Sequence, residues 1–129
     1  MDWEVIHTYS RADALRDGVL IDITDIAKHY GFKYPVAITG NLFNSYINPN
    51  EDLIAHGENI KTRVELVLAV LFYAIKGTKE KKSMTRIHFE VEFLMDAIEE
   101  KYTTIELIAD CGPGDNMEPV ITIMLPEDD

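Results

Sequence analysis

Carboxylates dominate the chemistry that the last forty residues of this sequence could perform. Glu90 and Glu92 alternate with apolar residues in one stretch, and Glu106 and Asp110 do so in the next. Because alternate side chains of a strand point to the same face, these four carboxylates would line one face of a sheet. Such a face could imitate nucleic-acid phosphates and attract a protein that grips nucleic acid through Arg and Lys.

A glycine-rich turn adds two more acids to this candidate surface. Turn formation and ordinary surface roles also account for them, and acidic faces commonly serve solubility alone, so both interpretations stay open. The candidate partner-binding residues are Glu90, Glu92, Glu106, Asp110, Asp115 and Glu118.

The net charge of −11 is spread very unevenly. Of 23 Asp and Glu residues, twelve lie in residues 90–129, where Lys101 is the single Lys or Arg. The remaining eleven acids in residues 1–89 are balanced by eleven Lys and Arg. Phosphate backbones are bound through Lys and Arg, so direct nucleic-acid binding is disfavoured. We expect instead a host protein with a basic nucleic-acid-binding surface as the partner.

A hydrolase centred on Asp110, Cys111 and a distant histidine is a rival hypothesis. Strand parity, however, places Cys111 on the core side with Leu107, whereas His88 has the opposite parity on its own strand. A buried structural cysteine is therefore expected, with no catalytic residues.

Metal and nucleotide chemistry find no matching pattern. The four histidines are scattered without ligand spacing, and Asp110, Asp115 and Glu118 match no EF-hand loop. Gly112 and Gly114 precede a strand, whereas a phosphate-binding loop leads into a helix. We expect a non-enzymatic protein without cofactor or metal.

Residues 24–39 resemble a helix-turn-helix, with Ala27 in the first helix and Gly31 at the turn. Against this, residues 35–47 contain no Lys or Arg, whereas a recognition helix needs side chains for base edges among basic phosphate contacts. A DNA-binding regulator using residues 24–47 is the alternative function.

The elements that would position these residues form one α+β domain over residues 1–129. Apolar residues at helical spacing predict a central buried helix between Asn59 and Gly77. Period-two alternation and short connections predict a three-stranded antiparallel C-terminal meander packed against that helix. The strands are expected within residues 87–93, 105–109 and 120–125.

Caps and breakers predict short N-terminal helices and a strand. Ser10, Thr24 and Thr39 are expected N-caps, and Gly18 and Gly31 are expected helix ends. The predicted segments are a helix from the Ser10 cap to Gly18, a helix over residues 25–30, a helix from the Thr39 cap through Ile47, a strand over 19–23, a break at Pro35 and a loop over 51–58.

A cytoplasmic location without membrane contact is expected. The lone Cys111 fits a reducing compartment, and the first residues lack the basic and apolar regions of a signal peptide. No apolar run approaches the length of about 20 residues that spans a bilayer.

Three stretches carry a resemblance to a known group: YSRADALRDGVLIDIT at residues 9–24, GFKYPVAIT at 31–39 and CGPGDNMEPVITIMLP at 111–126. Together they resemble an uncharacterised family of small acidic proteins encoded on bacterial plasmids, phages and integrative elements. The resemblance spans both ends of the chain and brings no established activity. It implies a setting in which accessory proteins often modulate host defence or element maintenance. With the acidic face, it leads to a hypothesis of a protein-binding inhibitor of anti-CRISPR or anti-restriction type.

Overall fold

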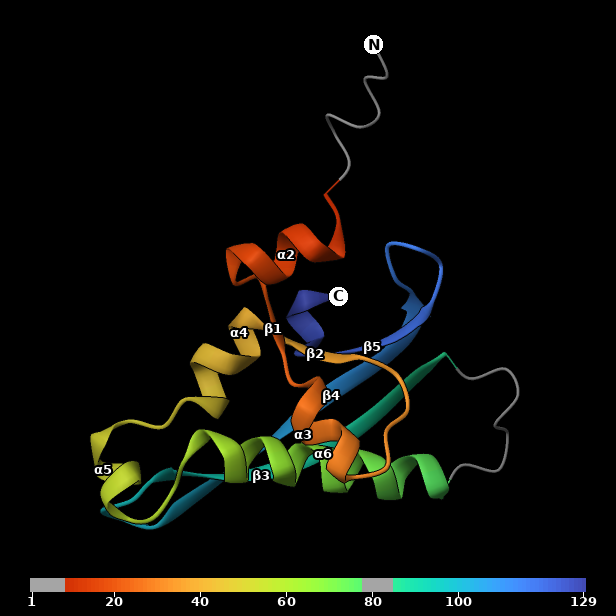
Figure 1. Cartoon of the computed structure of the whole chain (residues 1–129). Coiled ribbons are helices and arrows are strands. Elements are labelled where there is room, and N and C mark those ends of the chain that lie inside the picture. Colours follow the sequence, from red (N-terminus) through yellow and green to blue (C-terminus); the bar gives the residue numbers. More distant parts are fainter. Residues whose placement is uncertain (1–8, 78–84) are drawn as a thin grey trace.

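Residues 9–77 and 85–129 are described by the computed structural model, which has one mixed β-sheet with helices on both faces (Figure 1). The strands are β1 (Leu20–Asp22), β2 (Val36–Thr39), β3 (Arg86–Asp96), β4 (Lys101–Pro113) and β5 (Pro119–Met124). The helices are α2 (Arg11–Asp17), α3 (Thr24–His29), α4 (Gly40–Leu42), the π-helical η1 (Phe43–Ile47), α5 (Glu51–Ala55), α6 (Ile60–Lys76) and the 3-10 helix η2 (Pro126–Asp128). The predicted α+β class is confirmed.

In the described part of the chain the sheet contains five strands in the order β1-β2-β5-β4-β3, so the predicted meander is only part of it. β3, β4 and β5 pair antiparallel as expected, but β5 also pairs in parallel with β2. β2 was missed because Val36, Ala37 and Ile38 are all about 1% exposed. A strand covered on both faces lacks the alternation by which strands are predicted.

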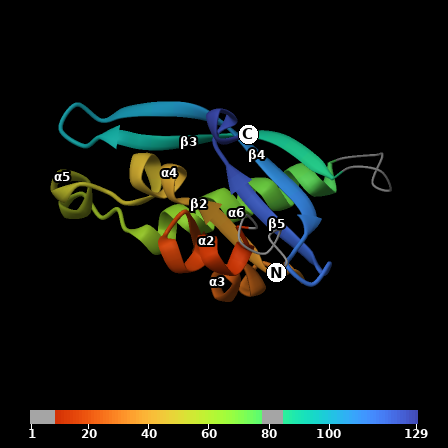
Figure 2. The same ribbon diagram turned by 90° about the horizontal axis from the view of Figure 1, so that it is seen from above.

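Two layers cover the sheet. α3 and α6 lie on one face, and α2 and η2 lie on the other (Figures 1 and 2). α6 begins after Asn59, whose side chain accepts the Thr62 backbone N–H at 2.8 Å, and runs to Lys76 as predicted. Its buried face meets the inward residues of the strands. The largest fully buried apolar side chains of this core include Phe93, Ile38, Leu42, Leu68, Leu71, Leu107 and Ile123.

Most of the predicted helix ends are confirmed. Ser10 forms a capping box with Asp13, and Gly18 ends α2 at φ 77°, a backbone conformation that favours glycine. Thr39 caps α4 by accepting the Leu42 N–H at 3.2 Å. Thr24 is a correction: it is the first residue of α3 and does not cap it, and its hydroxyl contacts Asp22 instead.

Residues 51–58 are not the predicted loop, because α5 occupies Glu51–Ala55. Asn50 accepts the Leu53 N–H at 2.9 Å and so caps the helix. Two acids in the first turn add favourable interactions with the helix dipole. The Asn-acid-acid pattern was therefore a start signal.

A helix-turn-helix does not form over residues 24–47. After α3 the chain enters strand β2, where a turn and recognition helix would be required. The following helical segment buries Leu42 and Ile47 in the core. Within the described ranges 9–77 and 85–129, no helix is long and apolar enough to cross a membrane.

One buried cation ties three parts of the fold together. Arg63, on the first turn of α6, is 2% exposed. Its guanidinium donates to the carbonyls of Tyr46, at 2.7 Å, and of Leu94, and it pairs with Glu58 at 3.1 Å. η1, the end of β3 and the start of α6 are thereby held together by charge-assisted hydrogen bonds, which are stronger than neutral ones.

Candidate protein-binding surface

Three exposed glutamates stand on the sheet face that points away from α6. Glu90 and Glu92 on β3, with Glu106 on β4, have the opposite parity to the core residues of their strands. Glu90 lies directly opposite Glu106 in the strand register, and Glu92 lies opposite Thr104. We call these three side chains the acidic face. Like charges directly opposite each other destabilise a sheet, so packing alone does not favour this arrangement.

Neutralising contacts reach only part of this surface. His88 Nδ1 lies 2.9 Å from Glu106 Oε1, with both side chains more than half exposed. Among the described residues, no side chain forms a hydrogen bond or ion pair with Glu90 or Glu92. Two carboxylates are therefore available to a partner without first breaking a contact to the described part of the chain.

Asp110 is half-buried at the margin of the acidic face. Arg86 Nε lies 3.4 Å from its carboxylate, while Arg86 Nη1 contacts Asp129 at 2.6 Å. Hydrogen bonding to Asp129 is the main cause that raises the pKa of Arg86, with a smaller contribution from Asp110. A partner cation would have to compete with Arg86 for Asp110.

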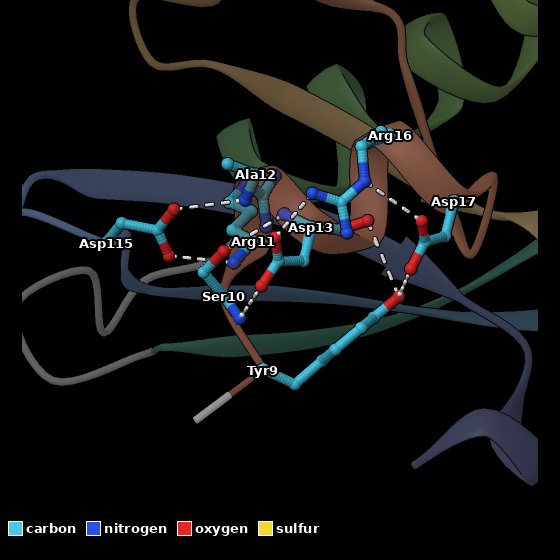
Figure 3. Close-up of polar contacts among 8 residues, drawn as sticks. All are labelled: Tyr9, Ser10, Arg11, Ala12, Asp13, Arg16, Asp17 and Asp115. Carbon is cyan, nitrogen blue, oxygen red and sulfur yellow. Dashed lines mark hydrogen bonds and ion pairs between the residues drawn. The ribbon is translucent and has the colours of Figure 1, made fainter. Parts of the chain in front are cut away.

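Asp115 is engaged by the chain itself. Its two carboxylate oxygens accept the backbone N–H groups of Arg11, at 2.7 Å, and Ala12, at 3.0 Å (Figure 3). These are the first N–H groups of α2, which have no partner inside a helix. Asp115 thus fastens α2 to the β4–β5 turn.

Arg11 strengthens the same junction from its side chain. Its guanidinium donates to Thr122 Oγ1 at 2.7 Å and to the Ile121 carbonyl at 3.1 Å. Partial burial lowers the pKa of Arg11, and the nearby Asp115 carboxylate opposes that effect. Residues from both ends of the chain are therefore locked together over β5.

Glu118 closes the β4–β5 turn. Its carboxylate accepts the Asn116 N–H at 3.1 Å, and its carbonyl accepts the Gly114 N–H at 2.6 Å. The side chain folds so closely over Gly114 that a Cβ there would stand 1.6 Å from a Glu118 oxygen. Glycine fits this turn because the Glu118 side chain occupies the space of a side chain. Of the six predicted residues, Glu90, Glu92 and Glu106 share one open face, and Asp110 lies at its margin beside Arg86. Asp115 binds the start of α2, and Glu118 binds backbone N–H groups within the turn.

Cys111 and His88 lie on opposite faces of the sheet. Cys111 is half-buried against the core, as its parity predicted, while His88 points from the opposite face. Within the part of the chain that the structure describes, no three His, Cys, Asp or Glu side chains lie close enough to hold a metal ion.

An open cleft of about 440 Å³ between α3 and α6 was not expected from sequence. The Tyr30 hydroxyl donates to Glu65 at 3.0 Å beside it, and this hydrogen bond raises the pKa of Tyr30. A tyrosine held protonated in this way supplies a hydrogen-bond donor and no activated nucleophile. Neither residue had a sequence signal beyond its place on a helix.

Comparison with known proteins supplies a family and no activity. No curated protein and no solved structure matches the chain. A family model described as "Family of unknown function (DUF6573)" matches residues 2–129. The match covers nearly the whole sequence, and the chain therefore belongs to the DUF6573 family of unknown function.

Proposed function

We propose that this chain is a non-enzymatic protein-binding protein whose acidic face engages the basic nucleic-acid-binding surface of a host protein. The observation that carries the proposal is the exposure of Glu90 and Glu92 without a partner among the described residues, beside Glu106. Carboxylates arranged along a strand face attract Arg and Lys, and this attraction accelerates association. The acidic face is expected to occupy a groove that otherwise holds phosphates.

The proposed setting is the bacterial cytoplasm, in which the chain acts as an accessory protein of a plasmid, phage or integrative element. Inhibition of a defence nuclease, of anti-CRISPR or anti-restriction type, fits an acidic binding face and the resemblance noted from residues 9–24, 31–39 and 111–126. Occupation of the partner's groove would exclude its nucleic acid without any chemical reaction. The acidic face is proposed to act as a nucleic-acid mimic in that sense.

The test is an affinity capture from bacterial lysate with three forms of the full chain. The face variant carries Glu90→Gln, Glu92→Gln and Glu106→Gln, and the unmodified chain is the reference. The matched control removes the same charge from exposed acids of α3, α5 and η2: Asp25→Asn, Glu51→Gln and Glu127→Gln.

A supporting result has four parts. The captured protein binds nucleic acid, is not captured by the face variant and is captured by the control variant. Duplex DNA competes with the chain for binding to this captured protein. Raising the salt from about 0.1 M to about 1 M shortens the Debye length from about 10 Å to about 3 Å and should release it. Equal capture by both variants would show that the acidic face serves solubility and would overturn the proposal.

A further inference from the structure

Among the described residues, β3 is an edge strand, and no strand pairs with the side that faces away from β4. It stands last in the order β1-β2-β5-β4-β3 and runs from Arg86 to Asp96. Eleven residues is long for an edge strand, because exposed edges invite pairing with other chains and are usually kept short. The side of β3 that faces away from β4 is therefore a candidate surface for pairing with another chain.

The hydrogen-bond register identifies which backbone groups face that open side. The Cys111 N–H donates to the Thr85 carbonyl at 2.6 Å, which is a hydrogen-bonded position one step before the Arg86–Asp110 pair. Bonded and non-bonded pairs alternate in an antiparallel ladder. Odd-numbered β3 residues consequently bond to β4, whereas the N–H and C=O groups of even-numbered residues point outward.

Leu94 provides an independent check of this alternation. It is even-numbered, and its carbonyl accepts the Arg63 guanidinium from α6, outside the ladder with β4. Arg63 thus closes the open edge at its C-terminal end. Among the described residues, no hydrogen bond from outside β4 reaches the backbone of His88, Glu90 or Glu92.

An apolar stripe on α6 follows the same edge. Leu66, Val70 and Tyr73 stand three, seven and ten positions after Arg63, which places all four on one flank of the helix. That flank faces β3, because Arg63 reaches Leu94 from it. Leu66 is 39% exposed and Tyr73 is 74% exposed, so the apolar surface continues outward from the edge.

We propose that the open edge of β3 accepts a basic, extended segment of the partner protein as an added antiparallel or parallel strand. Main-chain hydrogen bonds would form with His88, Glu90 and Glu92, in the mode by which exposed sheet edges bind peptides. Alternate side chains of the segment would rest on Leu66 and Tyr73. The others, Lys or Arg, would lie beside the acidic face.

Charge decides which occupant fits. A second copy of β3 would bring Glu90 and Glu92 against the same glutamates, and like charges across a strand pair are destabilising. A strand with Lys or Arg at alternate positions reverses the sign of that interaction. The inference rests on the proposed function, since it specifies how the partner of the acidic face is held.

The probe is a synthetic peptide of alternating lysine and valine, about ten residues long, which is a usual strand length. Its affinity for the full chain is measured by fluorescence anisotropy at low salt. The protein variants are Glu92→Pro, which removes one outward N–H without touching the ladder to β4, and Glu92→Gln, which removes the same charge and keeps the N–H. Strand addition predicts about tenfold weaker binding for Glu92→Pro than for Glu92→Gln.

A second arm keeps the test valid if Glu92→Pro fails to fold. The same peptide, N-methylated at alternate amides, retains its charge but cannot form the ladder, and it should lose at least about tenfold in affinity. Equal binding of the methylated peptide, no binding of either peptide, or a β3-mediated dimer in ultracentrifugation would overturn strand addition. If the face variant still loses its lysate partner in any of these cases, charge recognition by the acidic face stands without strand addition.

Discussion

Glu90 and Glu106 face each other at a non-hydrogen-bonded position of the β3–β4 ladder, where side chains approach most closely. Removing one charge should stabilise the fold. We expect Glu90→Thr to raise the free energy of unfolding by about 0.5 kcal/mol in urea denaturation. Glu92→Thr is the matched control, because Glu92 lies opposite Thr104, and it should change stability less. A fall in stability for Glu90→Thr would contradict this account.

Arg63 should be the most sensitive single position for stability. Arg63→Met keeps apolar packing on α6 but leaves the Tyr46 and Leu94 carbonyls without their donor. Because unsatisfied buried groups retain their desolvation cost, the loss should be on the order of 3 kcal/mol in thermal or urea unfolding. Arg63→Lys keeps the charge with fewer donors and should lose less. Equal stability of Arg63→Met and the unmodified chain would refute the role of Arg63 in holding η1, β3 and α6 together.

Asp115→Ala should loosen α2 while leaving partner binding intact. The change removes the acceptor of the Arg11 and Ala12 N–H groups, at a cost of about 1 kcal/mol by analogy with helix caps. Faster hydrogen exchange at those two amides is the direct measurement. Asn116→Ala, in the same turn, is the control. A loss of partner binding in Asp115→Ala that matches the loss in the face variant would return Asp115 to the binding surface.

α2 should loosen in acid. Hydrogen bonds from the Ser10 N–H and hydroxyl lower the pKa of Asp13 from 3.8, and the Tyr9 hydroxyl is the main cause that lowers the pKa of Asp17. A carboxyl group whose pKa is lower in the folded chain than in the unfolded chain stabilises the fold fully when the pH is above its unfolded pKa. This stabilisation is lost as the pH falls through its folded pKa. The protection of the α2 amides, measured relative to their unfolded exchange rates at the same pH, should therefore fall below about pH 4. Asp13→Asn should show a smaller fall in protection; an unchanged pH response would contradict the assignment.

Sequence patterns predicted β3, β4 and α6, which each have one solvent-exposed face, but missed the buried strand β2 and the short helix α5. β3 and β4 alternate, and α6 repeats at helical spacing, so their burial is visible in the order of residue types. β2 is buried on both of its faces, so Val36, Ala37 and Ile38 form an uninterrupted apolar run. The parallel partner that makes β2 a strand, β5, lies far away in sequence.

The candidate surface was predictable only where strand parity determines it. Glu90, Glu92 and Glu106 are placed by alternation, and the structure puts them on one face as expected. Asp115 is occupied by N–H groups of residues 104 and 103 positions away in sequence, which no local spacing indicates. The open edge of β3 depends on the order of the whole sheet and could not be inferred from β3 itself.

The parallel pairing of β2 with β5 has a consequence for biosynthesis. During synthesis, residues 36–39 leave the ribosome long before residues 119–124. Until β5 is available, the β2 edge that pairs with it has no partner strand, and the valine and isoleucine of β2 are exposed to water. Contacts so distant in sequence slow folding, because loop-closure entropy is lost before they form. The nascent chain should therefore remain a client for chaperones until translation reaches β5, and the sheet should close in a single late step.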